Sequence, residues 1–404
     1  MTAPRLTGSI DIVARTPNTA GAARVVIAGG GVAGLEGALA LRDHAGERVT
    51  IELVAPSLNF VYRPATVLEP FGEVLAPQFA ISEILRDGEI HHLLDSVAWV
   101  DRERREAHTS GGQVIRYDAL LLCPGVRARA SFAQAITISG ASQDAALVAL
   151  VADLDAGAVQ RLAFVVPAPG SWQLPLYELA LLTAERARER GLAISLSIFT
   201  SEPAPLEAFG ERVGNLARTL LADAGIELTC RAVCRVPDRH SLLVDDARSR
   251  RRPRARQERV LRFDRILALP RLHGPRIRGV PAVRDGFIPV DTHGRILGSR
   301  VEFAAGDATN CPVKHGSVAA QQADAAAQTI ASLAGAQVNP APCHPVATGI
   351  LPAGTKCRRV SASIVGGHSL RSQIWSPSAI PEEKIDALYL APRLAALREA
   401  GTPV

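Results

Sequence analysis

Apolar residues in the first part of the chain gather in short runs separated by a glycine-rich turn and an amphipathic stretch. The run over residues 24–28 (RVVIA) predicts a buried strand, LEGALALRDH over 35–44 a helix, and RVTIELV over 48–54 a second strand. The helix is introduced by the turn GGGVAG. This order predicts one strand–helix–strand unit.

A second series with the same order follows further along the chain. LAFVV over 162–166 predicts a strand, the stretch over 175–191 a helix that ends on Gly191, and AISLSIFT over 193–200 another strand. Because such repeats build parallel sheets, the sequence predicts an α/β fold with two Rossmann-like three-layer dinucleotide-binding domains.

The chain then returns to its first unit, since VEFAAGD and a helix from about Ser317 to Ala334 resume the apolar pattern, and Pro, Gly and Ser become frequent after Asn339. One domain is therefore expected to be inserted in the other. The predicted parts are a leader (1–21), a first dinucleotide-binding domain (22–130 and 283–338), a second dinucleotide-type domain (131–282) and a short C-terminal segment (339–404).

Composition changes this picture little. The chain has 404 residues, 47% hydrophobic and 21% charged, as in soluble globular proteins, and it contains no signal-type segment and no apolar run of the roughly 18 residues that span a bilayer. We expect a cytoplasmic protein of two or three domains.

The net charge of +5 is local, because residues 248–262 hold eight arginines and one glutamate. Only 4% of the residues are aromatic, so few side chains are present on which nucleic-acid bases could stack, and we expect no nucleic-acid partner. This arginine loop is either a solvated loop, a phosphate site or a contact for membrane headgroups.

The glycine turn carries the pattern Gly29-x-Gly31-x-x-Gly34 between a strand and a helix, where it is typical of dinucleotide binding. Gly29 permits the turn, Gly31 lets a pyrophosphate approach the backbone, and Gly34 lets helix and strand pack closely. The alternative is a purely structural turn. Glu52 fits the ribose-binding acid only roughly in spacing, so either Glu52 or backbone groups would hold the ribose.

Further motifs follow in a fixed order: NFVYRP at 59–64, YDALLLCPG at 117–125 and VEFAAGDATNCPVKHG at 301–316. With the glycine turn, they resemble the flavoprotein family that includes type II NADH dehydrogenases, sulfide:quinone oxidoreductases and flavocytochrome c sulfide dehydrogenases, within the pyridine nucleotide-disulfide oxidoreductase-like flavoproteins. The resemblance implies FAD and no metal. The FAD contacts it implies, beyond the glycine turn and Glu52, are Arg63, Pro64, Val97 (through its backbone), Cys123, Gly125, Gly306 and Asp307.

The second unit departs from this family. Where members that use NADH have a second glycine turn, residues 165–180 read VVPAPGSWQLPLYELA. Prolines 167, 169 and 175 remove backbone donors that would cradle a pyrophosphate, so conventional NAD(P)H binding is not expected. The PxYEL portion resembles the sulfide:quinone branch, and Glu178 within it is interpreted as a helix-side carboxylate.

Candidate catalytic residues are Cys123, Cys311 and Lys314. The sulfide:quinone branch uses paired redox cysteines, but residues 139–155 contain none. Cys123, Cys311 and also Cys357 are each either a thiol near the flavin or an apolar filler. Cys230 and Cys234 are interpreted as structural.

Lys314 and His315 enter a helix below the flavin, where Lys314 would stabilise a reduced, anionic flavin. The alternative is a surface pair at the start of the helix. Trp172 and Trp375 either line a pocket or pack in the core. A C-terminal helix over 384–400, interrupted by Pro392, is either a membrane anchor or a docking face, its apolar residues being Ile385, Leu388, Leu390, Leu394 and Leu397.

Together these motifs predict an FAD-dependent oxidoreductase with noncovalent FAD and an open choice of donor and acceptor. The acceptor is a small molecule or a quinone, with peripheral membrane contact and a homodimer as further expectations. One alternative is a quinone reductase at the membrane surface that uses NADH or a sulfur donor. Another is a flavin-binding sensor or interaction protein without turnover.

Overall fold

The computed structural model describes residues 21–72, 75–167, 173–246, 258–354, 356–366, 368–376 and 384–401. Three sequence predictions lie outside these residues: the leader up to residue 20, the roles of Pro169 and Trp172, and the arginine loop from 247 to 257. The end of that loop is described, and residues 259–262 form a strand.

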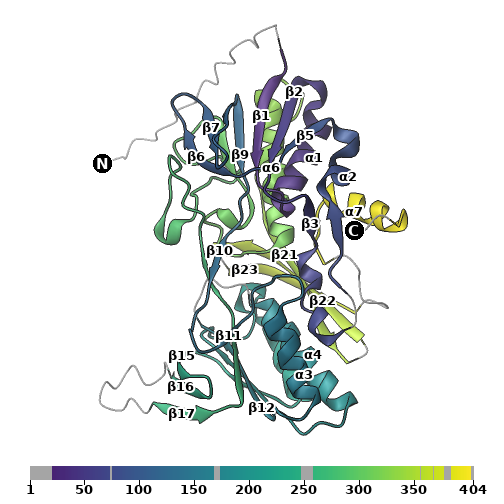
Figure 1. Cartoon of the computed structure of the whole chain (residues 1–404), viewed down its shortest axis with the longest axis vertical. Helices are drawn as coiled ribbons and strands as arrows, with labels where there is room; N and C mark the ends of the chain where they lie inside the picture. Colours follow the sequence, from purple (N-terminus) through teal and green to yellow (C-terminus); the bar gives the residue numbers. More distant parts are fainter. Residues whose placement is uncertain are drawn as a thin grey trace, which may run out of the picture.

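The first unit is built on a five-stranded parallel sheet in the upper half of Figure 1. Its strands are β1 (Ala23–Ala28), β2 (Val49–Val54), β5 (Ile90–Leu93), β9 (Ala119–Leu122) and β20 (Glu302–Ala304). In space they follow the order β20-β9-β1-β2-β5. The chain order reverses at β1, so the carboxyl ends of β1 and β9 meet at a topological switch point, where ligands bind in open α/β sheets.

Two layers cover this sheet. Helices α1 (Val32–Ala45) and α6 (Gly316–Leu333) pack on one face, and an antiparallel sheet covers the other; its strands are β6 (Val97–Asp101), β7 (Glu106–Thr109) and β8 (Val114–Arg116). The strand period explains this arrangement, since Val25 and Ile27 pack with the helices and Val26 packs with the antiparallel layer.

The second unit repeats these three layers in the lower half of Figure 1. Its parallel sheet has the order β11-β18-β12-β13-β14. The strands are β11 (Ile136–Thr137), β12 (Arg161–Val166), β13 (Ser195–Thr200), β14 (Ile226–Thr229) and β18 (Arg265–Ala268). The helices are α3 (Ala145–Asp155), α4 (Leu174–Glu189) and α5 (Glu211–Asp223), and the antiparallel layer is β15 (Ala232–Asp238), β16 (Ser241–Asp246) and β17 (Arg259–Arg262).

Short elements join the units. The chain leaves the first unit through β10 (Arg127–Arg129) and returns through β19 (Arg271–His273), and these two strands pair antiparallel. Within the first unit, β3 (Asn59–Val61) pairs with β4 (Gln78–Ala80), which leads into α2 (Ile81–Leu85). The second unit is thus inserted in the first, and the predicted fold class is confirmed.

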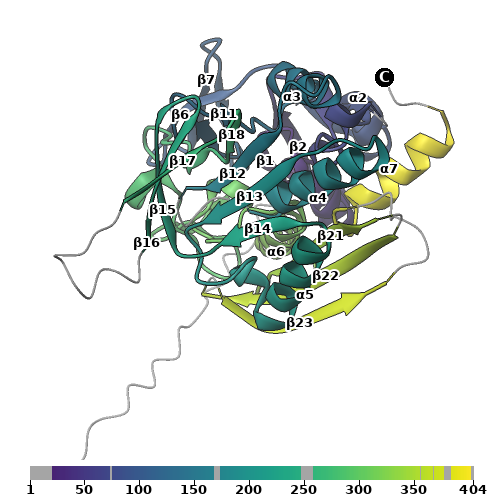
Figure 2. The ribbon, with the colours of Figure 1, turned by 90° about the horizontal axis from the view of Figure 1, so that it is seen from below.

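The C-terminal part is more structured than predicted. It forms an antiparallel sheet that lies between the two units in Figure 1 and whose strands spread over the lower part of Figure 2. The strands are β21 (Val346–Ala353), β22 (Lys356–Val365) and β23 (His368–Trp375). Residues of β21 and β22, among them Leu351 and Val360, belong to the apolar core of the second unit. The sequence interpretation missed these strands.

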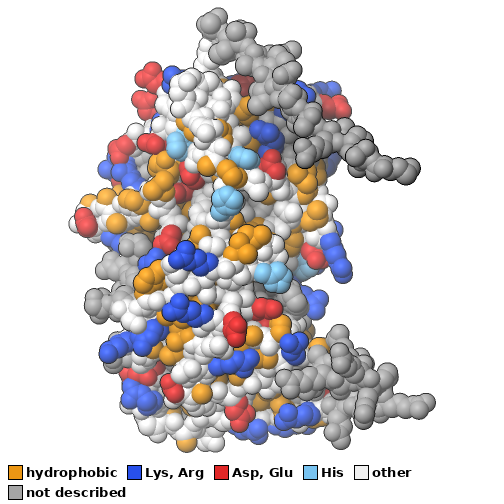
Figure 3. Space-filling view, turned by 180° about the vertical axis from the view of Figure 1, so that it is seen from behind, with side chains coloured by type: hydrophobic (Ala, Val, Ile, Leu, Met, Phe, Trp, Pro, Cys, Tyr) orange, Lys and Arg blue, Asp and Glu red, His pale blue; other side chains and the backbone are white. Residues whose placement is uncertain are grey.

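Helix α7 (Leu390–Glu399) begins later than predicted. Pro392 lies in its first turn, where the missing amide costs nothing, so it does not interrupt the helix. Leu390, Leu394 and Leu397 are buried against the first unit, whereas Leu388 is 68% exposed. The apolar face is therefore a docking face against the body of the protein, as one of the two alternatives predicted. On the face shown in Figure 3, apolar side chains are scattered among charged ones.

Candidate cofactor site

The glycine turn has the geometry of a dinucleotide cradle. Gly29 has a φ of +118°, and a Cβ there would overlap the carbonyl oxygen of Cys123 at the end of β9. A Cβ on Gly34 would overlap the carbonyl of Gly29, so helix and strand pack in direct contact. A Cβ on Gly31 would meet nothing within 4 Å. The loop is therefore closed toward the protein and open in front of Gly31.

The first turn of α1 faces this open space. Gly31 is its N-cap, no side chain caps the helix, and the turn holds no acidic residue. Its amide groups and the helix dipole therefore favour an anion. A pyrophosphate fits here, because the donors are free and a side chain would fill the space that it needs.

The motif around Gly306 lies beside this turn. The amide of Ala305 bonds to the carbonyl of Leu122 at 3.1 Å, and a Cβ on Gly306 would stand 3.0 Å from Ala33 and 3.3 Å from Ala319. Gly306 thus sits between the first turns of α1 and α6. Gly125 follows β9 at the same edge, with open space in front of it. The structure brings the glycine turn, the CPG stretch and the GD element together.

Asp307 and Lys314 form the charged part of this edge. Burial raises the pKa of Asp307, and the positive charges of Lys314 and Arg63 partly offset this rise. Lys314 is buried, donates to the carbonyl of Thr309 at 2.5 Å and lies 4.0 Å from the centre of the Phe287 ring. Burial lowers its pKa to about 8, partly opposed by Asp307. Since Lys314 is buried, the alternative of a surface pair is wrong.

His315 is the N-cap of α6, and its Nδ1 accepts from the amide of Ser317 at 3.2 Å. Burial lowers the pKa of His315 to about 4, so the imidazole is neutral at physiological pH. Arg63 and Pro64 lie in a short 3₁₀ turn, with Arg63 exposed. Val97 begins β6, half-buried against the sheet.

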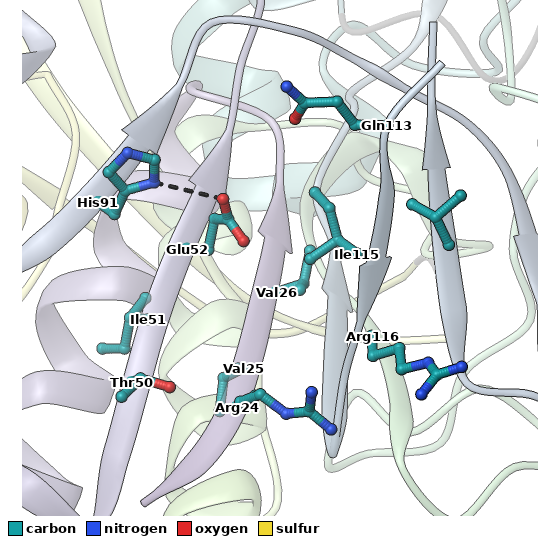
Figure 4. Close-up of a pocket in the computed structure, with 11 residues that line it drawn as sticks. Arg24, Val25, Val26, Thr50, Ile51, Glu52, His91, Gln113, Ile115 and Arg116 are labelled. Carbon is teal, nitrogen blue, oxygen red and sulfur yellow. Dashed lines mark hydrogen bonds and ion pairs between the residues drawn. The ribbon is translucent and has the colours of Figure 1, made fainter. Parts of the chain in front are cut away.

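Glu52 lies away from the glycine turn. It is level with Val26 in the middle of β2, three positions before the strand meets the loop, and its Oε1 is 3.3 Å from Nδ1 of His91. Figure 4 shows it among the residues that line a cavity of about 670 Å³ over the other half of the sheet. The residue beside the turn is Ala55, whose Cβ is 2.9 Å from where a Cβ of Gly30 would stand. This placement favours backbone groups as the ribose contacts.

The cysteines are free thiols in different settings. Cys123 is buried below the glycine turn, and burial raises its pKa to about 12, so it is protonated and unreactive at neutral pH. Cys311 is half-buried. Burial raises the pKa of its thiol, and the backbone of Val313 and the charge of Lys314 partly offset this rise. Cys357 is buried on β22. The geometry therefore speaks against Cys123 as a nucleophile.

Cys234 agrees with its structural interpretation, because it is buried in the core of the antiparallel layer of the second unit. Cys230 is half-buried and lies 3.7 Å from a guanidinium nitrogen of Arg218. Trp375 is on the outer strand β23 and 44% exposed, so the interpretation as core packing is wrong.

In the second unit, Pro167 follows β12 directly and lies at the start of the altered loop. The ribose-binding position of such a unit is the end of its second strand. Glu202 stands there, just after β13, but it is buried and accepts from Tyr177 at 3.1 Å, Thr200 at 2.9 Å and the Glu207 amide at 3.0 Å. The sequence interpretation missed Glu202, although an acid at the end of that strand is a readable signal.

Glu178 is not an ordinary helix-side carboxylate. It is buried on α4 and forms an ion pair with Lys384, which comes from the C-terminal part of the chain. Burial raises the pKa of Glu178, and Lys384 lowers it. No sequence signal connects residues that stand so far apart in the chain.

Comparisons with known proteins agree with this geometry. Residues 9–153 match the family described as "Pyridine nucleotide-disulphide oxidoreductase". The predicted resemblance to pyridine nucleotide-disulfide oxidoreductase-like flavoproteins is confirmed by this match, which lies in the first part of the chain. The predicted FAD cofactor and the predicted oxidoreductase class of this flavoprotein are thereby confirmed. No curated protein matches the sequence.

Solved structures share its fold. The sulfide:quinone oxidoreductase of Aquifex aeolicus superposes with a TM-score of 0.76 at 18% identity, over 94% of this chain and 90% of its own. A ferredoxin reductase of Rhodopseudomonas palustris gives 0.61 at 17%, over 84% and 82%. An NAD-dependent persulfide reductase of A. fulgidus gives 0.57 at 16%, over 84% and 64%. At these identities the likeness shows the shared fold alone.

In the part of the chain that the structure describes, no helix is long and apolar enough to cross a bilayer.

Proposed function

We propose that this flavoprotein holds FAD noncovalently where β1, β9 and β20 end, and that its electron donor is not NAD(P)H. In the proposed division, residues 22–130 and 283–338 form the FAD domain, and residues 131–282 form a domain that has lost its nucleotide. The FAD contacts would be Gly29, Gly31, Gly34, Arg63, Pro64, Val97, Gly125, Gly306 and Asp307.

The free first turn of α1 supports a pyrophosphate in front of Gly31. Asp307 stands in the short 3₁₀ turn Gly306–Ala308 with Lys314 and Arg63 as its charged neighbours, a suitable partner for the ribityl and phosphate part. Bound FAD would supply hydride or electron transfer at its N5 atom. Lys314, with its pKa near 8, would hold a positive charge close to the ring system at neutral pH.

The observation that carries the donor proposal is Glu202. Its carboxylate already accepts three hydrogen bonds from protein groups and is buried, so it has no exposed oxygen to offer a ribose. Pro167, at the start of the loop, has no amide to offer a phosphate. Both ends of a conventional nicotinamide site are therefore missing.

Anaerobic reduction tests this proposal. The purified chain is mixed separately with NADH, NADPH, sulfide and dithionite, and the flavin band near ~450 nm is followed. We expect dithionite to bleach the band and both nicotinamides to leave it unchanged for many minutes. Rapid bleaching by NADH would overturn the argument from Glu202. A colourless protein that cannot be reconstituted with FAD would overturn the site.

The same experiment separates the other functions. Bleaching by sulfide, followed by reoxidation with a water-soluble quinone, would support a sulfur donor and a quinone acceptor, as the name of the Aquifex aeolicus relative suggests. A yellow protein that only dithionite reduces would favour a flavin-binding sensor. Binding to vesicles of anionic lipid and the mass of the particle in solution test peripheral membrane contact and a homodimer.

A further inference from the structure

The two strands that join the units form a ribbon with a basic face. In the antiparallel pair of β10 and β19, Arg127 stands opposite His273 and Arg129 stands opposite Arg271. Figure 1 shows β10 between the two halves of the molecule. Directly opposite residues share one side of a ribbon, and so do residues two positions apart in a strand. These four residues therefore lie on one side, which we name the basic face.

The basic face has no carboxylate of its own. Arg127, Arg129 and Arg271 are exposed, and none of them forms an ion pair with a residue that the structure describes. Like charges that stand directly opposite, as in Arg129 and Arg271, destabilise a strand pair. Between β7 and β8 the same kind of position is neutralised, because Arg116 pairs with the opposite Glu106 at 3.1 Å. The ribbon thus keeps a charge cluster that the fold does not balance.

The segments around the ribbon add positive charge. Residues 124–135 contain no acid, and residues 270–286 contain four arginines and one aspartate. Beyond the basic face, Arg276 and Arg284 are exposed, and the guanidinium of Arg278 lies over the ring of Trp99 at 4.8 Å. Val283 beside them is 44% exposed. Arginine and scattered apolar groups are what protein interfaces favour, whereas lysine is depleted there.

The basic face begins beside the candidate cofactor site. Arg127 is two residues after Gly125, which has open space in front of it where β9 ends. On the β19 side, a Cβ on Gly274 would overlap the backbone nitrogen of Phe287, whose ring centre lies 4.0 Å from Nζ of Lys314. A molecule that binds to the basic face is therefore next to the predicted flavin.

The form of this surface favours a large partner. Its arginines stand on an exposed ribbon and are not among the residues that line the cavity of Figure 4. Small molecules bind in concave sites with a few convergent polar groups. An extended patch of unpaired positive charge instead complements the acidic surface of a protein and steers its approach.

We infer that the basic face binds an acidic one-electron carrier protein, and that this carrier is the electron donor of the flavoprotein. The inference rests on the proposed function, because it supplies the donor that replaces NAD(P)H. Two reduced carrier molecules bind in turn, and each passes one electron to the bound FAD. Water supplies one proton, so the two electrons and the proton leave the flavin in its reduced, anionic form. Each carrier is oxidised by one electron and dissociates.

The first test measures reduction by an acidic carrier. A plant-type [2Fe–2S] ferredoxin is reduced photochemically and mixed without oxygen with the FAD-loaded protein, and stopped-flow spectra follow both partners. We expect the second-order rate constant at low salt to fall about 10- to 100-fold in the neutralised variant, Arg127→Gln/Arg129→Gln/Arg271→Gln. At about 0.5 M salt, where charges are screened beyond a few ångströms, native and variant proteins should react at nearly the same rate.

A matched control loses the same charge elsewhere. Its three arginines are exposed, lie outside the ribbon and also lack an ion pair with any described residue: Arg48, Arg212 and Arg300. Replacing all three by glutamine should leave the rate within about twofold of the native value, because steering depends on charge near the contact. An equal loss of rate in both variants would assign the effect to net charge and overturn the inference.

Arg271→Glu separates binding from folding. In this variant opposite charges face each other across the ribbon, so the melting temperature of the protein without FAD should be native or higher. The rate with reduced ferredoxin should nevertheless fall further than in Arg271→Gln. A lower melting temperature would refute the repulsion between Arg129 and Arg271, and a native rate would overturn the inference.

The remaining outcomes are decisive in the same way. A native rate in the neutralised variant, or a native protein whose rate does not change with salt, would overturn the inference. If the neutralised variant loses binding to vesicles of anionic lipid but keeps its native rate with ferredoxin, the basic face contacts a membrane instead. If dithionite bleaches the native protein fully and reduced ferredoxin does not, only the donor inference fails. If the native chain binds no FAD, the proposed function itself fails.

Discussion

The expected pyrophosphate site in front of Gly31 can be tested by adding a single methyl group, because a methyl group on Gly31 and one on Gly34 would have different effects. A methyl on Gly31 would enter open space, and the backbone there has an ordinary φ of −87°. The cost to the fold is the lower preference of Ala for an N-cap, below about 1 kcal/mol. Gly31→Ala should therefore fold and unfold at nearly the native temperature without FAD.

The same methyl should weaken FAD binding strongly, because it stands where the pyrophosphate would approach the amides. Loss of one hydrogen bond to a charged group costs about 1.5–3 kcal/mol, and a weaker helix-terminus interaction adds up to ~1 kcal/mol. The dissociation constant of FAD should therefore rise by roughly 10- to 1000-fold. Fluorescence titration of the protein without FAD measures it.

Gly34→Ala is the matched contrast. Its methyl would overlap the carbonyl oxygen of Gly29 and stand 2.9 Å from the carbonyl carbon, so helix α1 has to move away from the strand. Overpacking of this kind costs about 1–3 kcal/mol or more, and this variant should lose stability even without FAD. Native FAD affinity in Gly31→Ala would refute the cradle, and equal thermal stability of the two variants would refute the packing argument.

Three further outcomes are expected. Lys314→Met should lower the flavin reduction potential by about 70 mV relative to Lys314→Arg. This shift corresponds to a charge interaction of roughly 3 kcal/mol, which a cation about 5 Å from the reduced flavin would supply. Spectroelectrochemistry measures the two potentials, and equal values would contradict the role of Lys314. Stability should rise by about 3 kcal/mol as the pH goes from 4 to 6.5, because unfolded His315 binds a proton near pH 6.5 and the folded residue only near pH 4. His315→Asn should flatten this rise in urea unfolding curves, and an unchanged rise would assign it elsewhere. Cys123→Ala should leave flavin reduction unchanged, because the thiol is buried with a pKa near 12; a lost reaction in stopped-flow traces would restore it as a nucleophile.

The sequence alone determined the features that rest on local geometry. The positive φ at Gly29 and the direct contact at Gly34 are requirements that other residues do not meet, so the turn between β1 and α1 was readable from its spacing. The buried strands and the helix α6 follow from their period. The resemblance to the flavoprotein family also implied that the GD element binds the same FAD as the glycine turn.

Some elements of the structure have only a weak signal in the sequence. The strands β22 and β23 mix small, polar and charged residues with few large apolar ones, and β21 contains a glycine and a proline, so their hydrophobic period is faint. Glu52 has almost the spacing of a ribose-binding acid, but one strand position decides the face on which it lies, and the structure places it over the other half of the sheet.

Only the tertiary structure determined the partners and the burial of the charged groups. Glu178 and Lys384 are 206 positions apart, and the ion pair forms because the segment before α7 packs between the two units. Glu202 is withdrawn from solvent by Tyr177 and Thr200, and Lys314 is buried over Phe287. Burial raises the pKa of Glu178 and of Glu202 and lowers the pKa of Lys314, and this burial depends on which distant elements pack together. A sequence shows which side chains can ionise, but the packing decides which of them are held in the charged form.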